Sequence, residues 1–587
     1  MNRIHVGREV STGKAFYVPR KSFDTHWHMI GGTGKGKTTM IFTLLLQLLL
    51  CSFLPACFII IDPLGAFSNH LLMWMASPYC TDLVRHRLIY FEASRENVVL
   101  SINPLLYDTQ ANGHFKIARA TELILRAWES QNIEAMPRLA RWVFNCFWAA
   151  AQLGLTISDC VHFLMPGSPL HAPLIACLPE QLRYEWNEIT QGRNTTEISR
   201  ILESARNRLK PFFENEILRR MFGGTRNLLD MYCFMREARI LLVNLAPMNR
   251  LSSQAAAAIG GLIINEVLAV VRSLAGKTVL PTFLLLDEFQ NFVGPDLAEA
   301  IPEVRQLGMK LILSHQSLSQ LKRGDCDLTS LIFTAQSRAV FGLHGEDADT
   351  LAHEFASLGY DPERIKQEIL ASKQRQVGHR IVELENRSES HSTTESRGST
   401  ESGGQNNGES IQHETPYAMP EGFTTSSGRS SSSSVKSDSS TGTSRSYGRS
   451  QTLVPIVEDF SEVSSRTFVQ FDEQRTLWGQ KIRRRKTGTA LLQVVDDPHI
   501  HEVAVKRSAP GFLGFDLPTI HKCFPKIIEA TERLIERNFE NGPFCTPAEI
   551  EVETERRLAR VLNQRIAIPG QPSPAAEMPN DQANPFA

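Results

Sequence analysis

A glycine-rich octapeptide at residues 31–38, Gly-Gly-Thr-Gly-Lys-Gly-Lys-Thr, constrains the fold of this chain more than any other feature. A short strand-like run, His28 to Ile30, precedes it, and an apolar run without Gly or Pro, Met40 to Leu50, follows it. Strand, glycine loop and helix in this order are the context in which the pattern GxxxxGK(S/T) forms a phosphate-binding P-loop. The alternative is a simple glycine-rich turn, but the flanking elements favour the P-loop.

The P-loop pattern assigns a role to each of its residues. Glycines let backbone N–H groups turn toward an anion, and the N-terminus of the following helix favours negative charge. Lys37 is expected to reach the β- and γ-phosphates, and Thr38 to hold Mg²⁺. The predicted cofactors are therefore ATP and Mg²⁺. The predicted nucleotide-binding residues are Gly31, Gly32, Thr33, Gly34, Lys35, Gly36, Lys37, Thr38 and Thr39.

Two adjacent carboxylates end a second buried-strand pattern. Phe283 to Leu286 are apolar, and Asp287 and Glu288 follow directly. Ligands bind at the carboxyl ends of the strands in open α/β sheets. We therefore expect Asp287 to complete the Mg²⁺ site and Glu288 to be the general base for the attacking water. The alternative is an exposed acidic turn after a strand, against which the upstream P-loop argues.

Composition limits the class of protein. The chain has 587 residues, which is enough for about two to four domains. Its 62 basic and 63 acidic residues leave no overall basic charge, so any contact with DNA must come from local patches. The ten cysteines show no CxxC pair, which is typical of reduced cysteines in a cytosolic protein.

One uncharged run, Met40 to Ile61, has transmembrane length. It starts on the P-loop, contains Pro55 and ends at Asp62. We therefore predict a buried helix to about Leu54 and a buried strand from Cys57 to Ile61. No signal peptide is visible, and we expect a cytoplasmic protein with only peripheral contact to the inner membrane.

Hydrophobic periodicity divides the chain into segments. Strand signals alternate with helical signals on both sides of a purely helical region, which predicts an α/β fold with a mainly parallel sheet and an all-helical insertion. A Ser- and Gly-rich stretch cannot bury enough apolar surface to order itself and predicts a disordered loop. The expected segments are 1–109, an N-terminal hairpin and the P-loop part of the core; 110–235, the helical insertion; 236–385, the second part of the core; 386–452, the disordered linker; 453–566, a C-terminal strand and helices; and 567–587, a disordered tail.

Five stretches of this sequence match motifs that occur together in one protein family. They are the P-loop; Ile61-Asp62-Pro63 with Gly65, similar to a strand-end DPKG pattern; Asn103-Pro104-Leu105; Leu286 to Phe292; and Ser314 to Leu321. Together they resemble the TraD/TraG-type coupling ATPases of conjugative type IV secretion, within the broader HerA/FtsK family of hexameric motors. The resemblance covers about residues 1–380 and, weakly, 450–510, and it implies a RecA-like P-loop ATPase.

The resemblance implies two further functional residues. Gln316 is expected to be the sensor that couples the state of the γ-phosphate to motion, the alternative being a surface glutamine in a turn. Arg305 resembles the arginine finger that stabilises charge on the γ-phosphate of a neighbouring subunit, the alternative being a solvated helix residue. Arg338 is the second choice for the finger.

The function implied is an ATP-driven DNA translocase that delivers DNA to a conjugation channel as a homo-oligomer, a hexameric ring, with relaxosome or secretion-channel proteins as partners. Two alternatives stay open: a HerA/FtsK-type motor in repair, segregation or defence, and a substrate-docking receptor in which ATP is an assembly switch. This chain departs from the family in having no N-terminal transmembrane helices and in carrying Leu64 where Lys is usual. Its one dense basic run, Lys481 to Lys486, fits either a DNA-backbone contact or a solvated helix end.

Overall fold

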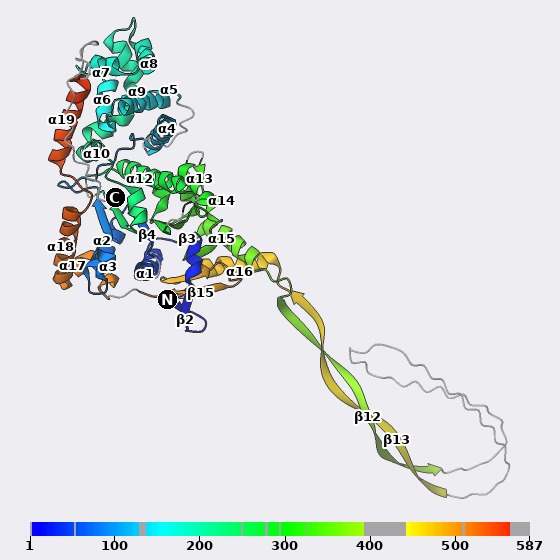
Figure 1. Ribbon diagram of the computed structural model, residues 1–587. Helices are drawn as coiled ribbons and strands as arrows, with labels where there is room; N and C mark the ends of the chain where they lie inside the picture. The colour runs from blue at the N-terminus through cyan, green and yellow to red at the C-terminus, as the bar shows by residue number, and fades with distance from the viewer. Residues whose placement is uncertain are drawn as a thin grey trace. The chain divides into compact units, whose positions relative to one another are not determined.

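An eleven-stranded sheet runs through the larger of two units in this computed structural model, residues 1–362 with 470–587 (Figure 1). Neighbouring strands from β11 to β5 are parallel, and the four strands at the other edge pair antiparallel. The predicted α/β fold with a mainly parallel sheet is thus confirmed. The spatial order is β2 (Ala15–Pro19), β1 (Arg3–Glu9), β15 (Ile500–Val505), β14 (Thr489–Gln493), β11 (Ser337–Val340), β3 (Trp27–Ile30), β8 (Met309–His315), β7 (Thr282–Leu286), β4 (Cys57–Asp62), β6 (Ile240–Asn244) and β5 (Leu88–Glu92).

The structure describes most of the chain. The predicted tail, 567–587, lies outside the described residues, as do residues 393–441 of the predicted linker. The described ranges are 3–51, 55–107, 109–127, 137–247, 250–275, 277, 280–292, 295–323, 326–392, 442–507 and 511–563.

The central strands are buried on both faces. Every residue of β4, β6 and β7 is buried, which explains why these strands read as continuous apolar runs rather than alternating ones. Because side chains alternate along a strand, Ile59 and Ile61 enter one core while Phe58 and Ile60 enter the other. The sheet therefore separates two hydrophobic cores.

Helices cover both faces of the sheet. One core contains side chains of α1 (Lys37–Leu49), α2 (Ala66–Ala76), α3 (Asp82–Arg85) and α18 (Pro525–Asn541). The other contains side chains of α12 (Ser253–Ser273), α13 (Pro295–Glu303), α14 (Thr329–Ile332), α15 (Gly345–Leu358) and α16 (Phe471–Arg483). Helix α17 (Leu517–Cys523) precedes α18 in the chain.

The uncharged run after the P-loop consists of a helix and a strand, as predicted. Helix α1 ends at Leu49, earlier than the expected Leu54, and β4 begins at Cys57. In the described part of the chain, only α12 has the length and composition of a membrane span, and 61% of its most apolar window is buried inside the protein. A core helix of a soluble domain has the same properties.

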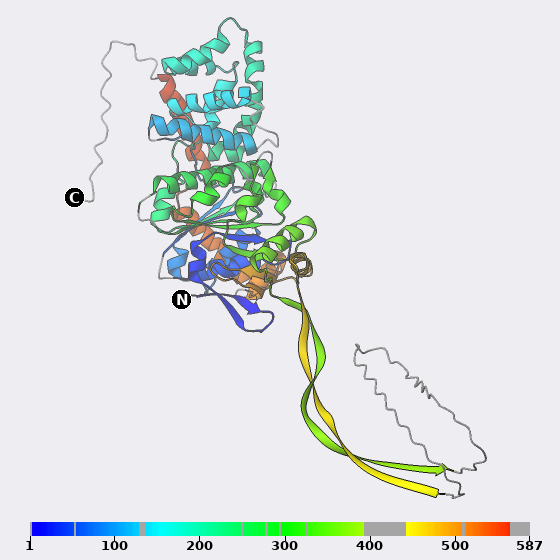
Figure 2. The same ribbon diagram turned by 90° about the vertical axis from the view of Figure 1, so that its right-hand side faces the viewer.

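Helices alone occupy the described residues between positions 110 and 236 (Figure 2). Large aromatic side chains form part of their core, since Trp142, Phe147, Phe163 and Trp186 are buried. The elements are α4 (Gln110–Ala127), α5 (Pro137–Gln152), a 3-10 turn (Ile157–Cys160), α6 (Val161–Leu164), α7 (His171–Cys177), α8 (Glu180–Thr190), α9 (Thr195–Glu214), α10 (Glu216–Met221) and α11 (Met231–Arg236).

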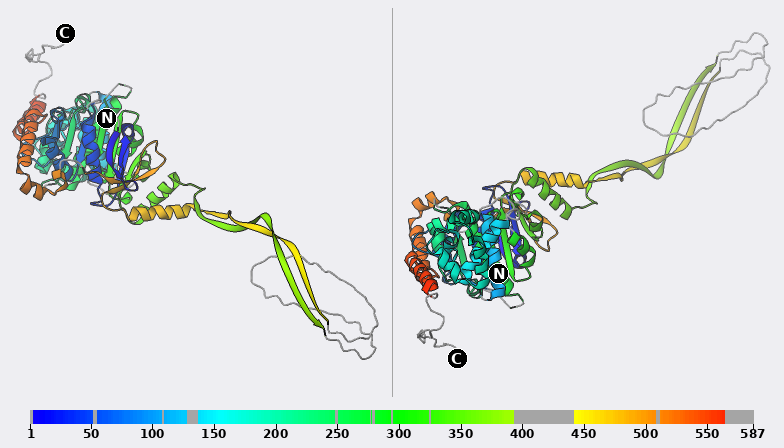
Figure 3. Two further views of the ribbon diagram at one scale, coloured as in Figure 1. Left: turned by 90° about the horizontal axis from the view of Figure 1, so that it is seen from below. Right: turned by 90° about the horizontal axis from the view of Figure 1, so that it is seen from above.

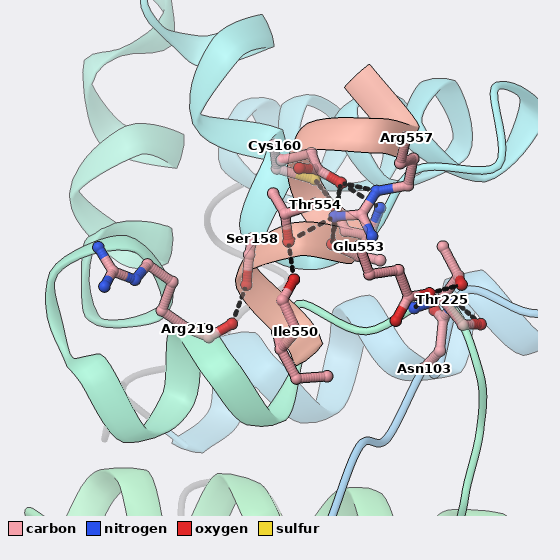
Figure 4. A network of polar contacts seen from close by, with 11 residues as sticks. Asn103, Ser158, Cys160, Arg219, Thr225, Ile550, Glu553, Thr554 and Arg557 are labelled. Atoms are coloured by element: carbon pink, nitrogen blue, oxygen red, sulfur yellow. Dashed lines mark hydrogen bonds and ion pairs between the residues drawn. The ribbon is translucent and has the colours of Figure 1, made fainter. Parts of the chain in front are cut away.

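The last helix, α19 (Pro547–Asn563), lies against this helical segment (Figure 4). The Arg557 guanidinium donates to the Asp159 carboxylate at 2.8 Å, and both side chains are buried. Asp159 also accepts from the backbone N–H of Thr156 at 2.9 Å. At the other end of the contact, the Thr225 N–H donates to the Glu553 carboxylate at 3.0 Å. A buried charge pair with additional hydrogen bonds fixes the register of α19 on the helices.

The two ends of the chain meet in the sheet. Strand β15 pairs with β1, and β14 pairs with β11, so the strand expected within 453–566 belongs to the same sheet as the P-loop. The predicted N-terminal hairpin is present as β1 and β2. The segment boundaries drawn from the sequence stay a prediction, but the N-terminal hairpin, the P-loop strand and the C-terminal strands belong to one sheet.

The second unit, residues 363–469, is an antiparallel ribbon of two strands, β12 (Ile365–Ser392) and β13 (Gly442–Phe468), which wind around each other (Figures 2 and 3). The predicted disordered linker therefore needs a correction at both ends, because residues 386–392 and 442–452 lie in these strands. Backbone hydrogen bonds between two strands need no buried side chains, so a composition rich in Ser and Gly did not reveal the pairing.

Candidate nucleotide-binding site

The P-loop lies between the carboxyl end of β3 and α1, as the sequence predicts. Gly34 and Gly36 have φ angles of 70° and 112°, which favour glycine strongly, and Gly36 is the N-cap of α1. Lys37 is buried, and its Nζ donates to the carbonyl of Gly31 at 2.6 Å. Burial lowers the pKa of Lys37, while the carboxylates of Glu288 and Asp287 oppose that shift. The lysine ammonium thus faces both predicted catalytic carboxylates.

Glu288 is held in a strained backbone conformation at the end of β7. Its φ angle is 50°, in the left-handed region that residues with a side chain rarely adopt. The Asn291 side-chain amide donates to the Glu288 carbonyl at 2.9 Å, and the Gln290 amide donates to the Glu288 carboxylate at 2.6 Å. These bonds hold the carboxylate at the edge of the sheet where the P-loop lies.

Gln316 connects the P-loop to Glu288. Its Nε2 donates to Glu288 Oε1 at 3.0 Å, and its Oε1 accepts from the Thr33 hydroxyl at 2.8 Å. Strand β8 lies between β3 and β7 in the sheet, so the residue after β8 falls between the two motifs. The side-chain amide offers one donor and one acceptor face, and both are engaged. Gln316 therefore contacts both motifs, and its role as a sensor stays a prediction.

Asp287 is a buried carboxylate with a raised pKa. Burial raises its pKa to about 6, with the Asp62 and Glu288 carboxylates adding to the rise and a hydrogen bond to Ser314 and the Lys37 charge opposing it. Asp62 itself accepts from the backbone N–H groups of Leu64 at 3.0 Å and Ser68 at 2.8 Å. Three carboxylates and one ammonium thus share this edge of the sheet.

These residues fit a Mg²⁺ ion that is bound together with a nucleotide. Within the described ranges, no three His, Cys, Asp or Glu side chains are grouped to hold a metal by themselves. Mg²⁺ usually takes one or two protein ligands and completes its shell with phosphates and water. Thr38 is exposed at the start of α1, and a cation near Asp287 would compensate its buried charge and the repulsion from Asp62 and Glu288.

Mg²⁺-dependent nucleotide binding is expected to weaken as the pH falls through about 6. The raised pKa of Asp287 means that its carboxyl group becomes neutral at about 6 rather than at its ordinary 3.8, and a neutral carboxyl is a poor Mg²⁺ ligand. Calorimetric titration with Mg²⁺ and a non-hydrolysable ATP analogue between pH 5 and 8 measures this. The phosphates of the nucleotide also titrate, and Asp287→Asn should leave only their contribution to the change of affinity with pH. If the affinity of this variant changed with pH as strongly as that of the wild type, Asp287 would not be the Mg²⁺ ligand.

A buried histidine pair links the strands of the P-loop and of Gln316. His28 Nε2 and His315 Nε2 lie 2.7 Å apart, and the rings stack with centroids 4.9 Å apart. His315 Nδ1 donates to the carbonyl of Ser317 at 2.9 Å, so its Nε2 accepts and His28 donates. Burial lowers the pKa of His315 to about 4 and that of His28 well below its ordinary value, so both rings are neutral. Lone histidines in a sequence give no signal of such a pair.

We expect this pair to hold Gln316 in place, because His315 precedes it directly. His28→Gln retains an N–H donor for His315, whereas His28→Met does not. The Met variant should lower kcat about tenfold with little change in ATP affinity, and the Gln variant should stay near the wild-type kcat. Steady-state ATPase assays and thermal melts of both variants test this. Equal kcat values for Gln and Met would show that the pair only fills space.

The two predicted finger residues lie in different surroundings. Arg305 is exposed and precedes β8, whereas Gln316 follows β8 at its other end. A strand of seven residues spans about 23 Å, so Arg305 does not reach the P-loop of its own chain. Arg338 is buried, and its guanidinium lies 4.7 Å from the centre of the Phe333 ring. The second choice for the finger is therefore wrong for this conformation, because a core arginine cannot reach a neighbouring subunit.

A turn near the C-terminal strands contacts the P-loop, which the sequence did not predict. The Gly488 N–H donates to the carbonyl of Lys35 at 2.9 Å. A Cβ atom at Gly36 would lie 3.2 Å from Gly488, so the glycine permits this approach. No local pattern could reveal the contact, since residues more than four hundred positions apart form it.

The basic run before this turn is mostly exposed, but three of its side chains contact other parts of the protein. Arg485 is buried and pairs with Glu502 at 2.6 Å, Arg483 pairs with Asp349 at 2.6 Å, and Lys481 lies 4.6 Å from the centre of the Trp478 ring. The sequence left open whether the run contacts the DNA backbone or is a solvated helix end. These contacts decide for neither, because the run lies at the end of a helix and three of its side chains have partners within the protein. It belongs to the packing of α16 and β14.

Comparison with known proteins identifies the type of chain. Residues 281–416 match a family model described as the TraM recognition site of TraD and TraG, and this range contains Glu288 and Gln316. Over this range the chain is similar to TraD and TraG. The resemblance drawn from the sequence motifs is thereby confirmed. No curated protein matches the chain.

Solved structures show a distant likeness to this chain. The unbound bacterial conjugative coupling protein TrwBΔN70 is 14% identical, with a TM-score of 0.48 over 87% of this chain and 90% of that one. TrwB in complex with the GTP analogue GDPNP is 15% identical, with the same TM-score and coverage. VirB4 of Thermoanaerobacter pseudethanolicus is 14% identical, with a TM-score of 0.39 over 60% of this chain and 86% of that one. Likenesses at these scores support no conclusion of their own.

Proposed function

We propose that the chain is an ATP-driven DNA translocase, a coupling ATPase that delivers DNA to a type IV secretion channel during conjugation. The observation that carries the proposal is the side-chain connection from Thr33 through Gln316 to Glu288. It joins a phosphate loop, a polar sensor and a carboxylate base at one edge of the sheet. The family match over residues 281–416 supports the conjugative role.

Each residue has a defined part in hydrolysis. Lys37 would bind the β- and γ-phosphates, and Thr38 and Asp287 would hold a Mg²⁺ ion, which when bound would neutralise charge on the phosphates. Glu288 accepts a proton from the attacking water, and its backbone strain and its bonds to Gln290 and Gln316 fix the carboxylate for this step. Loss of the γ-phosphate would then be transmitted through Gln316, because its amide contacts both the P-loop and the base.

Movement of DNA requires several subunits acting in turn. We infer a hexameric ring, in which the exposed Arg305 of one subunit stabilises charge on the γ-phosphate bound by its neighbour. The ring would hold DNA through local basic patches, since the chain as a whole carries a net charge of −1. Relaxosome or secretion-channel proteins are the proposed partners, with the ring in the cytoplasm and any contact with the inner membrane peripheral.

Action of Arg305 on a neighbouring site predicts recovery of activity in mixed rings. Arg305→Ala and Lys37→Ala should each abolish most ATP hydrolysis alone. Mixing them creates interfaces in which an intact Arg305 faces an intact P-loop, so part of the activity should return at intermediate ratios. Phosphate release across mixing ratios measures this, with subunit exchange monitored by native mass spectrometry. If exchanging rings recover no activity at any ratio, Arg305 is not the finger.

A substrate-docking receptor is the second candidate, because the matched family model is described by the recognition of a partner protein. In that case ATP would control assembly rather than movement. DNA separates the two functions: a motor hydrolyses ATP faster when DNA is bound, and a receptor does not. The DNA dependence of ATP hydrolysis is therefore the test of the proposed function.

A further inference from the structure

A cavity of about 250 Å³ opens beside the first turn of α1. Its walls come from three parts of the chain: Thr38, Thr39 and Phe42 on α1, Phe67 and His70 on α2, and Arg507 after β15. Neither Glu288 nor Gln316 belongs to the described lining. The cavity thus shares two threonines with the phosphate loop but excludes the residues assigned to hydrolysis.

We propose that this cavity binds the nucleoside, the base and ribose, of the nucleoside triphosphate, an inference that rests on the proposed nucleotide binding. The γ-phosphate lies toward Glu288 and Gln316, so the nucleoside must leave the P-loop on another side. Thr38 and Thr39 border both the phosphate site and the cavity, so the cavity directly adjoins the phosphate loop. Its volume is below the roughly 300–1,000 Å³ of sites that enclose a whole drug-sized ligand. It therefore suits a ligand whose phosphates lie outside it.

The chemistry of the lining matches a planar base. The Phe42 and Phe67 rings pack edge to face with centroids 5.4 Å apart and give the cavity an apolar floor. Arg507 is exposed and has no hydrogen bond or ion pair within the described part of the chain. A planar guanidinium stacks on flat π systems, so an unpaired arginine over an apolar floor can hold a base between two faces.

Two further contacts define the site. A Cβ atom at Gly514 would lie 3.8 Å from Arg507 Nη1, so the guanidinium extends toward the glycine that borders the cavity. The His70 Nδ1 is hydrogen-bonded to the carbonyl of Ala66 at 2.7 Å, which fixes the ring and leaves its Nε2 for a hydroxyl of the ribose or an edge of the base. The C-terminal segment thereby completes the nucleotide site that the P-loop begins.

Two ligands distinguish contacts to the nucleoside from contacts to the phosphates. Calorimetric titrations of the full chain with Mg²⁺ and either a non-hydrolysable ATP analogue or inorganic tripolyphosphate report both parts of the site. Arg507→Ala should weaken binding of the ATP analogue about tenfold and change tripolyphosphate binding less than about twofold. His70→Ala should show a smaller effect of the same kind. Lys506→Ala, which removes an equal charge from the adjacent exposed position, should change neither ligand.

The outcomes distinguish this inference from the proposed function. Equal weakening of both ligands by Arg507→Ala would mean that the arginine contacts phosphate and would overturn the nucleoside site. Unchanged affinity for the ATP analogue in both Arg507→Ala and His70→Ala would place the nucleoside elsewhere and overturn it too. If the wild-type chain bound neither ligand, or if Lys37→Ala bound both as well as the wild type, the proposed nucleotide site itself would fail.

Discussion

Glu288→Gln is expected to reduce ATP hydrolysis by about 10²–10⁴-fold while ATP binding is retained. The amide has nearly the size and shape of the carboxylate, and its oxygen can still accept from Gln316 or Gln290, which bond to the wild-type side chain at 3.0 and 2.6 Å. It cannot accept a proton from water, so only the chemical step is lost. Phosphate release measures turnover, and calorimetry with the ATP analogue measures binding.

Lys37→Ala is the matched comparison for this prediction. Removal of the buried ammonium should weaken nucleotide binding itself, because no other side chain takes its place at the phosphates. The two variants therefore separate binding from chemistry at one site. Normal phosphate release by purified Glu288→Gln would remove Glu288 from the mechanism and leave Asp287 and Asp62 as the remaining carboxylates to test.

Local patterns in the sequence predicted the parts of the site that lie close to a strand end. The P-loop has a strand before it and a helix after it, and Asp287 and Glu288 directly follow an apolar run. Parallel strands that share one sheet bring such ends together, so Gln316 at the end of β8 came to lie between the two motifs. The family resemblance had pointed to Gln316, and its position between the motifs follows from the order of the strands, in which β8 lies between β3 and β7.

Contacts between distant parts of the chain gave no signal of this kind. The pairing of β14 with β11 brings Gly488 to the P-loop, and the bond between His28 and His315 depends on two strands being neighbours. Arg338 looks like any charged residue in the sequence, yet β11 carries it into the core. Burial of this kind follows from tertiary packing, which a single sequence does not display.

The predicted boundaries of the segments were limited in the same way, because a sequence shows local patterns but not which distant parts of the chain pair. Helical periodicity located the helices between β5 and β6, because an amphipathic pattern is local. The ribbon of β12 and β13 escaped prediction because its strands are rich in polar residues and are paired only with each other. Composition reports how much surface a segment can bury, and it says little about backbone pairing.

The central claim, that ATP hydrolysis is coupled to DNA, is tested most directly by the steady-state ATPase rate of the assembled protein with and without DNA. The account predicts a several-fold rise in kcat with single- or double-stranded DNA and none in Glu288→Gln. The DNA concentration for half-maximal stimulation should rise with salt, because phosphate contacts release counterions. A rate that is the same with either form of DNA, in rings shown to be assembled, would contradict the motor and favour a receptor controlled by ATP.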